Sequence, residues 1–381
     1  MLNRNRVCIN GRFITQPISG VQRYATELVL GIDGLLASGA IDGTRVAFEL
    51  LVPSKPAARQ LELRHITTRV VGNTGGHLWE QLELPRFVDG NALLCLCNSA
   101  PLASLIGRIN TIVTIHDLAY LYFPQAYSRR YRLLYRILTP LIMRFATRII
   151  TVSAAERASI VKLFPQVESR LTAIQNGTSA MPDLPVQTNG VKCNTQLTHL
   201  VLYVGALNRR KNLQGVVDAF RKVKSQLGNV RLGIVGSAGA AFSKAGFVVP
   251  PEIVGHVDFF GQIDDFVRLA ELYSRSRCCV FPSFFESSGL PPIEAMSCGC
   301  PVVTSDIPAL RERCGDAALY CNPADPDSIA DQILKLLKSE TVYEEFRRRG
   351  TEWARRFSWD ECARETFSVV KELLEPLACH T

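Results

Sequence analysis

The chain has 381 residues, a formal net charge of +8, and a composition of 47% hydrophobic and 20% charged residues. This length predicts two or three domains with cores of their own, and the composition is that of a globular enzyme, which excludes a disordered chain. No apolar run reaches the roughly 18 residues of a membrane span, and the N-terminus lacks a signal-peptide core, so we expect a soluble or peripheral protein. Its positive charge favours anionic partners such as phosphates or a membrane surface.

The N-terminal half alternates strands and helices. A strand over Arg6–Asn10, a loop over Gly11–Ser19 and a helix over Val21–Leu36, opened by Gly20, predict the first unit of an open α/β sheet. In such sheets, ligands bind at the carboxyl ends of the strands. Further strands are expected over Ala47–Val52, Ile66–Val71, Thr111–Ile115, Thr147–Ser153 and Leu171–Ile174, with helices over His77–Phe87, ended by Pro85, and over Glu156–Phe164.

A histidine stands where the strand Thr111–Ile115 ends. Asp117 follows His116, and at the carboxyl edge of the sheet the imidazole would be able to donate to a leaving phosphate or a sugar hydroxyl. A single histidine is more often structural, but this position favours a functional role for His116.

A basic helix is predicted over Ser128–Arg148. It carries six arginines and no acidic residue, with Pro140 on the exposed side. An opposite apolar face is expected to pack on the sheet and contains Tyr131, Leu134, Leu138, Leu141 and Phe145. Two interpretations of the basic face stay open: a solvated surface, or one that meets anionic lipid headgroups or a lipid diphosphate acceptor.

The second half restarts the alternation after a polar linker. The strand Leu200–Val204 leads through a loop with Arg209, Arg210 and Lys211 into the helix Leu213–Lys224, which Asn212 is expected to cap. Three cations at a strand–helix turn predict a diphosphate site, because arginine forks onto phosphate oxygens and lysine adds a point charge. Later strands are expected over Val230–Val235, Val257–Gly261, Cys278–Phe281, Pro301–Thr304 and Ala317–Tyr320, with helices over Asp264–Ser274, Pro308–Arg313, Ile329–Leu337, Val342–Arg356 and Glu361–Leu374.

The turn after the strand Cys278–Phe281 combines donors and acceptors. A polar loop ending at Ser288 precedes Gly289 and Leu290, which open a short helix whose bare backbone N–H groups suit a phosphate. Two carboxylates, Glu286 and Glu294, bracket the turn and suit sugar hydroxyls. The spacing predicts a sugar-nucleotide site, and the alternative is an ordinary strand–helix turn with two solvated glutamates.

This turn resembles the hallmark of glycosyltransferase family 4. Glu286 and Glu294 are separated by seven residues that enclose Gly289-Leu290-Pro291, and the resemblance continues through Glu294–Gly299 and Pro301–Val303. The resemblance implies an α/β protein of the GT-B type, with two Rossmann-like domains facing across a cleft. We expect an acceptor domain over 1–180, a linker over 181–198, a nucleotide-sugar domain over 199–356, and a C-terminal helix over 357–381 that packs back on the first domain.

The resemblance also implies roles for individual residues. Glu286 would hold donor-sugar hydroxyls, Glu294 the ribose, and His116 would lie at the reacting sugar, so that His116 and Glu286 are the expected catalytic residues. Gly20, in the stretch Ser19–Tyr24, would face the donor phosphates, together with Ser288, Gly289 and Leu290. The family usually has arginine where this chain has Ala206, so Arg210 or Arg209 is expected to join Lys211 on the diphosphate.

The expected function is therefore a retaining transfer of a sugar from a nucleotide sugar. GDP-mannose is the favoured donor, and the acceptor would be a glycan or a polyprenyl-diphosphate-linked glycan in envelope, lipopolysaccharide or exopolysaccharide biosynthesis. The alternatives are a nucleotide-sugar epimerase of the same fold and a catalytically silent sugar- or lipid-binding scaffold. No nucleic-acid partner is expected.

Neither a cofactor nor a metal is expected. The twelve cysteines are spread over the chain and lack zinc spacing, which favours reduced thiols and a cytoplasmic protein, or one peripheral on the inner face of the membrane. Arg210 and Lys211 already supply positive charge for a diphosphate, which a metal ion would otherwise bring.

Overall fold

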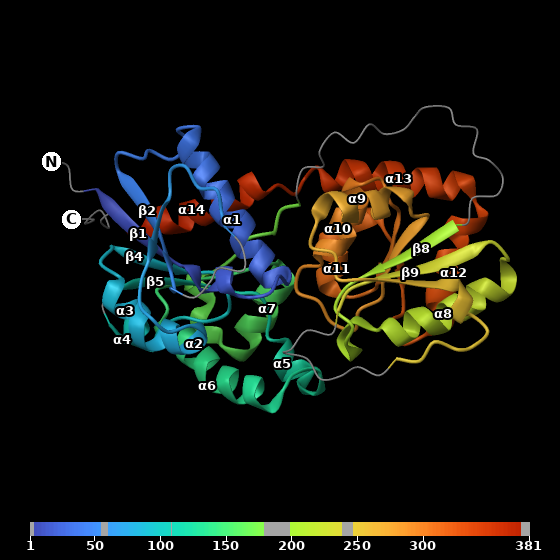
Figure 1. Cartoon of the computed structure of the whole chain (residues 1–381), viewed down its shortest axis with the longest axis horizontal. Coiled ribbons are helices and arrows are strands. Elements are labelled where there is room, and N and C mark those ends of the chain that lie inside the picture. Colours follow the sequence, from blue (N-terminus) through green and yellow to red (C-terminus); the bar gives the residue numbers. More distant parts are fainter. Residues whose placement is uncertain (1–3, 55–59, 108, 179–198, 238–246, 375–381) are drawn as a thin grey trace. The chain divides into compact units, whose positions relative to one another are not determined.

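The computed structural model describes residues 4–54, 60–107, 109–178, 199–237 and 247–374, so that the predicted linker 181–198 lies outside the described residues. Two compact units contain them, and each has its own parallel sheet (Figure 1). The first unit takes Met1–Leu118, Leu133–Gly177 and Phe357–Thr381, and the second takes Ala119–Arg132 and Thr178–Arg356. The two Rossmann-like sheets that the alternation predicted are confirmed.

The first sheet has seven parallel strands in the order β3-β2-β1-β4-β5-β6-β7. Its central strands are rich in Val, Ile and Leu and are buried on both faces, as expected for a parallel sheet covered by helices on each side. The strands are β1 (Asn5–Asn10), β2 (Val46–Val52), β3 (Thr67–Val70), β4 (Ala92–Cys95), β5 (Asn110–Ile115), β6 (Arg148–Thr151) and β7 (Leu171–Ala173).

Helices from both ends of the chain cover one face of this sheet. The first helix, α1 (Gly20–Ala37), packs along the last one, α14 (Trp359–Leu374), and a Cβ atom at Gly31 would lie 2.9 Å from the Cβ of Ala363 (Figure 1). Glycine therefore permits this close helix contact. The other helical segments of the N-terminal half are η1 (Gly11–Thr15), α2 (Gly76–Leu78), η2 (Trp79–Glu83), α3 (Leu84–Phe87), α4 (Leu102–Ile106), α5 (Ala119–Tyr122), η3 (Pro124–Ala126), α6 (Arg129–Phe145), α7 (Ala154–Leu163) and η4 (Pro165–Arg170).

The helical segment predicted over His77–Phe87 reaches Phe87, so Pro85, which was expected to end it, lies inside its last turn. A π-helical segment, η2, precedes the proline, and the N–H of Leu84 bonds to the carbonyl of Trp79 five residues earlier. The wider turn comes immediately before Pro85, which has no N–H to give to the next turn, so the helix tolerates the proline there.

The buried face of α6 differs from the predicted one. Leu134 and Phe145, expected to pack on the sheet, are each 38% exposed, whereas the buried residues are Tyr135, Leu138, Thr139, Ile142 and Met143. The helix starts at Arg129 and ends before Arg148, which begins β6. The observed buried stripe follows the 3.6-residue period, and it leaves Leu133 and Ile137 among the exposed arginines. Within the described ranges, no helix combines the length and apolar character needed to cross a bilayer.

The second sheet has six parallel strands in the order β10-β9-β8-β11-β12-β13. Helices α8 and α12 pack together on one face, and α9, α10, α11 and α13 cover the other (Figure 1). The strands are β8 (His199–Val204), β9 (Val230–Val235), β10 (Val257–Gly261), β11 (Cys278–Phe281), β12 (Val302–Ser305) and β13 (Leu319–Cys321). The helical segments are η5 (Arg209–Lys211), α8 (Leu213–Gln226), η6 (Val254–His256), α9 (Phe266–Arg275), α10 (Leu290–Ser297), α11 (Pro308–Cys314), η7 (Gly315–Ala317), α12 (Pro326–Lys338) and α13 (Glu340–Ala354).

A buried ion pair lies at the carboxyl edge of the first sheet. The Nε of Arg12, just after β1, lies 3.2 Å from Oε1 of Glu80, and both side chains are almost completely buried. Glu80 also accepts from Ser99 Oγ at 2.8 Å, Asn10 Nδ2 at 2.7 Å and His77 Nδ1 at 3.1 Å. Burial opposes ionisation of the carboxyl, but Arg12 and His77 outweigh it and lower the pKa of Glu80 to about 2.

This ion pair predicts an acid-sensitive first unit. A carboxyl whose pKa is lower in the folded state stabilises the fold above about pH 4.5, and this contribution disappears as the pH falls towards 2. We expect a loss on the order of 3 kcal/mol from Glu80 over this range, measured by urea unfolding with tryptophan fluorescence.

The matched variants separate this effect from general acid sensitivity. Glu80→Gln leaves Arg12 buried without a counter-charge and should cost about 3–5 kcal/mol near neutral pH, while its stability should fall less steeply with acid. Changing both Arg12 and Glu80 to Met should recover most of the loss. Glu62→Gln, on the surface, serves as the control, and identical pH slopes for it and Glu80→Gln would contradict the assignment.

Candidate functional site

The predicted turn lies between β11 and α10 of the second unit. Gly289 precedes the first residue of α10 and has a φ of 70°, and a Cβ atom there would lie 2.6 Å from Cδ2 of Leu310. Only glycine meets both conditions. The next residues after Leu290 are Pro291 and Pro292, which carry no N–H, so Gly289 and Leu290 supply the backbone N–H groups at the start of this helix, and no side chain caps them from the Gly289 position.

Asn212 organises the loop that carries the predicted cations. It has a φ of 56° and caps α8, because its side chain accepts from the N–H of Gly215 at 3.2 Å, which confirms the predicted cap. Its Nδ2 also donates to the carbonyls of Pro282, at 3.0 Å, and Pro323, at 2.7 Å. One side chain thus joins the loops that follow β8, β11 and β13.

Glu286 lies against two of the cations. Its Oε1 is 2.5 Å from Lys211 Nζ and 3.3 Å from Arg210 Nη1, and the three side chains are buried or nearly so. The same Arg210 nitrogen donates to the carbonyl of Phe285 at 2.8 Å. Burial disfavours the carboxylate, yet Lys211 and then Arg210 keep the pKa of Glu286 below its usual value. Arg209 is exposed, so it is Arg210 that joins this cluster.

The other predicted donor-side residues are also buried. Glu294 lies on α10 and accepts a hydrogen bond of 3.4 Å from the hydroxyl of Tyr273, while Ser288 is buried just before the glycine. Ser305, at the end of β12, holds the loop by donating to the carbonyl of Ser283 at 2.6 Å. The second unit therefore brings the cations, Glu286 and the opening of α10 to the carboxyl ends of β8 and β11.

Gly20 and His116 belong to the first unit. Gly20 is the exposed first residue of α1. His116 follows β5 and is buried, with its Nε2 2.8 Å from the carbonyl of Leu96 and its ring edge-on to Tyr24 at 4.7 Å between centroids. A carbonyl only accepts, so Nε2 carries the proton. Burial lowers the pKa of His116, and the neutral ring therefore offers Nδ1 as an acceptor. In this neutral form the one N–H bonds to the carbonyl of Leu96, and the expected role of His116 at the reacting sugar stays a prediction.

The sequence analysis missed two asparagines near these residues. Asn98, in the loop after β4, accepts from the backbone N–H of His116 at 2.6 Å, and Asn208 accepts from that of Lys211 at 3.1 Å. Both partners lie in loops at strand ends, where asparagine is common as a turn residue. The asparagines themselves indicated turns at these places. The sequence did not indicate which backbone N–H groups their side chains would bind.

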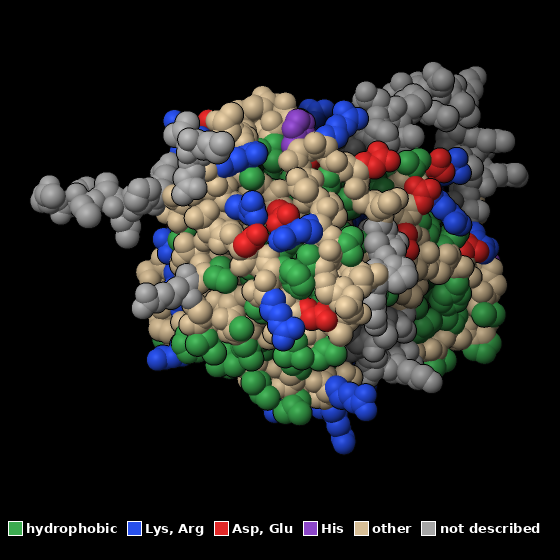
Figure 2. Space-filling model, turned by 60° about the vertical axis from the view of Figure 1, so that its left-hand side comes forward, with side chains coloured by type: hydrophobic (Ala, Val, Ile, Leu, Met, Phe, Trp, Pro, Cys, Tyr) green, Lys and Arg blue, Asp and Glu red, His purple; other side chains and the backbone are tan. Residues whose placement is uncertain are grey.

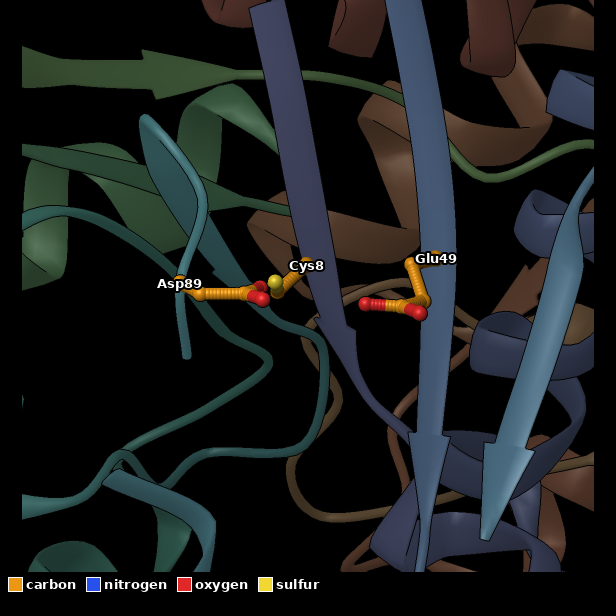
Figure 3. A group of neighbouring side chains, drawn as sticks. All are labelled: Cys8, Glu49 and Asp89. Carbon is orange, nitrogen blue, oxygen red and sulfur yellow. The ribbon is translucent and has the colours of Figure 1, made fainter. Parts of the chain in front are cut away.

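Within the described part of the chain, a group of potential metal ligands lies away from these residues. Ligand atoms of Cys8, Glu49 and Asp89 lie within 4.8 Å of one another (Figure 3). Arg69 is 3.0 Å from Glu49 and 3.6 Å from Asp89, and Arg6 is 2.9 Å from Asp89. Burial raises the pKa of the Cys8 thiol to about 11, so it is protonated at neutral pH. The arrangement is that of an ion-pair network whose carboxylates already have cationic partners.

Known proteins agree with this architecture. Residues 76–180 match the family described as Glycosyltransferase Family 4, and residues 196–353 match that described as Glycosyl transferases group 1. The O-antigen chain mannosyltransferase B of Escherichia coli is 31% identical over 270 residues, which are 69% of this chain and 70% of that protein. The O-antigen chain mannosyltransferase RfbU of Salmonella typhimurium is 30% identical over 219 residues, which are 58% of each.

Solved structures show the same fold. The Anabaena protein HepE, in complex with UDP-glucose, is similar with a TM-score of 0.69 over 97% of this chain and all of that one, at 19% identity. The paired sheets, the match of both halves to glycosyltransferase families and the 31% identity over two thirds of the chain agree with the predicted resemblance. The chain belongs to glycosyltransferase family 4 and is a glycosyltransferase of the GT-B fold.

Proposed function

We propose that this glycosyltransferase takes its sugar from a nucleoside-diphosphate sugar bound at the carboxyl ends of β8 and β11. The observation that supports this most directly is the cluster of Arg210, Lys211 and Glu286 beside the α10 turn. Cations and backbone N–H groups in one partly desolvated place stabilise the charge that develops on a leaving diphosphate. Glu286 and Glu294 would then hold hydroxyls of the sugar and of the ribose.

The cations would exchange partners when the donor binds. Lys211 and Arg210 contact the Glu286 carboxylate in this structure, and a diphosphate would compete with that carboxylate for them. Once released, Glu286 can accept hydrogen bonds from the donor sugar. The same two cations supply the positive charge that a divalent ion would otherwise bring, so the proposed reaction needs no metal.

The relatives guide the choice of donor and acceptor. Two of them are named as mannosyltransferases of O-antigen chains, which favours GDP-mannose and a glycan or lipid-linked glycan acceptor of envelope biosynthesis for this chain. Transfer with retention of configuration is part of the proposal. HepE is in complex with UDP-glucose, so a uridine-diphosphate sugar is the alternative donor against which GDP-mannose should be tested.

A mixed basic and apolar face supports binding to an anionic membrane. The outer side of α6 presents Leu133, 65% exposed, and Ile137, 58% exposed, together with the exposed Arg136 and Arg144. Figure 2 shows hydrophobic side chains with lysines or arginines among them along the lower part of the molecule, where Figure 1 places α6. Aliphatic side chains enter the headgroup boundary while arginines bind lipid phosphates. This face would bring the enzyme to a lipid-linked acceptor.

A first prediction separates the two glutamates. Glu286→Gln removes the negative charge that competes for Lys211 and Arg210, so free GDP should bind at least as tightly as to the wild type, while sugar transfer falls by about 10²–10³-fold. Glu294→Ala should instead weaken GDP binding. Titration calorimetry and transfer rates measure both, with Glu271→Gln on the surface of α9 as control. Unimpaired GDP binding by Glu294→Ala would remove that residue from the ribose role.

A second prediction concerns donor, stereochemistry and metal. Incubation with a panel of nucleotide sugars in the presence of a chelator should release free sugar slowly from GDP-mannose, with the first-formed anomer matching the donor, as followed by NMR. The rate should stay within about twofold when magnesium or manganese is added. Formation of an isomeric nucleotide sugar would indicate the epimerase, and no turnover of any donor would indicate the scaffold. Activity that appears only when metal is added would contradict the proposed role of the two cations.

A third prediction tests the α6 face. The wild type should float with liposomes that contain anionic lipid at low salt and should detach as salt is raised, because screening weakens the attraction. Each arginine near the surface contributes about 1 kcal/mol, so a variant with Arg129, Arg136 and Arg144 changed to Gln should bind weakly. Changing Leu133 and Ile137 to Ser should also weaken binding, but with little change in its salt dependence. Flotation of neither the wild type nor the variants would leave α6 as a solvated face.

A further inference from the structure

We propose that Asn98 is a positioning residue for His116, holding it with the proton on Nε2 and with Nδ1 as the acceptor. The inference rests on the proposed function only where it assigns Nδ1 to a hydroxyl of the substrate. Asn98 itself is not a catalytic residue in this proposal, because its contacts are with the protein backbone.

The loop after β4 holds the end of β5 at three points. The N–H of Asn98 donates to the carbonyl of Thr114 at 3.0 Å, and Asn98 Oδ1 accepts from the N–H of His116 at 2.6 Å. Two residues earlier, the carbonyl of Leu96 accepts from His116 Nε2 at 2.8 Å. The first two contacts fix the backbone at Thr114 and at His116, and the third fixes the imidazole ring, so the tautomer depends on the position of this loop.

Asn98 is suited to this position by its conformation. Its φ is 58°, in the left-handed region that asparagine adopts more readily than most residues, and its side chain is buried. The left-handed turn allows the carbonyl of Leu96 and the side chain of Asn98 to face the same residue. An alanine here would lose the acceptor and would also strain the backbone.

The other side of the loop is anchored by the buried ion pair. Ser99 accepts from Nη2 of Arg12 at 2.8 Å and donates to Oε1 of Glu80 at 2.8 Å. A buried ion pair usually adds little net stability compared with apolar residues, because desolvation offsets the attraction. Its hydrogen bonds do fix geometry, and here they hold the residue next to Asn98. We therefore infer that Arg12 and Glu80 act on His116 through this loop.

Titratable groups around His116 come from three other places. Asp117 follows it in the chain, Tyr24 on α1 packs against the ring, and Glu156 on α7 accepts from the N–H of Leu118 at 3.0 Å. Burial and Asp117 raise the pKa of Glu156 to about 8, so that it is largely protonated at neutral pH. Of these groups, Asp117 favours protonation of His116, while burial opposes it more strongly.

Two substitutions of Asn98 separate its conformation from its hydrogen bond. Asn98→Gly keeps the left-handed backbone and removes the acceptor, whereas Asn98→Asp keeps the acceptor and adds a negative charge beside the His116 N–H. Nitrogen-15 NMR of the histidine side chains reports both tautomer and titration, and a His116→Gln sample assigns the His116 signal. This readout needs no transfer activity, so it stands even if the proposed donor chemistry fails.

The wild type should show the Nε2-protonated tautomer of His116 alone. Asn98→Gly should show both tautomers and lose at least tenfold in turnover, with the apparent affinity for the donor unchanged within twofold. Asn98→Asp should keep one tautomer. Because it adds a negative charge, the titration of His116 and the acidic limb of the pH–rate profile should both move to higher pH. Asn322→Gly, in the second unit, is the matched control for the loss of an asparagine.

The proposal is overturned if Asn98→Gly and Asn98→Asp both leave the tautomer and the titration of His116 at their wild-type values. If Asn98→Gly does not fold, as judged by circular dichroism, Ser99→Ala takes its place, since it loosens the same loop without touching the left-handed residue. The expected effect of Ser99→Ala is a smaller shift in the same direction. An unchanged His116 spectrum in Ser99→Ala would remove the ion pair from the proposal.

Discussion

In each sheet, buried cations join the loops that follow the two strands between which the strand order changes direction. In the first sheet the reversal lies between β1 and β4, and Arg12 after β1 reaches Ser99 after β4. In the second it lies between β8 and β11, and Lys211 and Arg210 after β8 reach Glu286 after β11. Loops diverge at this point of a parallel sheet and leave a crevice for ligands. A buried charge must be paired, so in the second sheet the need for a partner draws the loops after β8 and β11 together.

Parts of this arrangement could be predicted from the sequence because they depend on local signals. Apolar runs broken by turn residues predicted the parallel strands, and the spacing of Glu286 and Glu294 around Gly289 predicted the turn. The choice of Arg210 over Arg209 was not predictable, because adjacent residues in a short turn differ only in which one the neighbouring loop meets. The contacts of Asn98 and Asn212 join residues far apart in the chain and leave no pattern in one sequence.

The buried face of α6 differs from the one that its arginines predict. The arginines predict one exposed side of this helix, and the residues opposite them are then expected to form its apolar face. The structure instead buries a stripe that contains Tyr135 and Ile142 and leaves Leu133 and Ile137 outside. An exposed leucine is unremarkable for a globular protein, but aliphatic and basic residues without acidic ones on a single helix face are typical of an interfacial helix.

The two cation bridges differ in how completely the protein satisfies them. Glu80 accepts from Asn10, Arg12, His77 and Ser99, so the bridge in the first unit is closed by the protein's own donors and serves to hold a loop. One oxygen of Glu286 contacts both cations. It lies beside the start of α10, where no preceding helical turn offers carbonyls to the N–H groups of Gly289 and Leu290. An anion with several oxygens can take over these cations and reach the backbone donors together. The first bridge is therefore suited to fixing geometry and the second to exchanging a carboxylate for a phosphate, which are the two roles that the proposed positioning of His116 and the proposed donor site require.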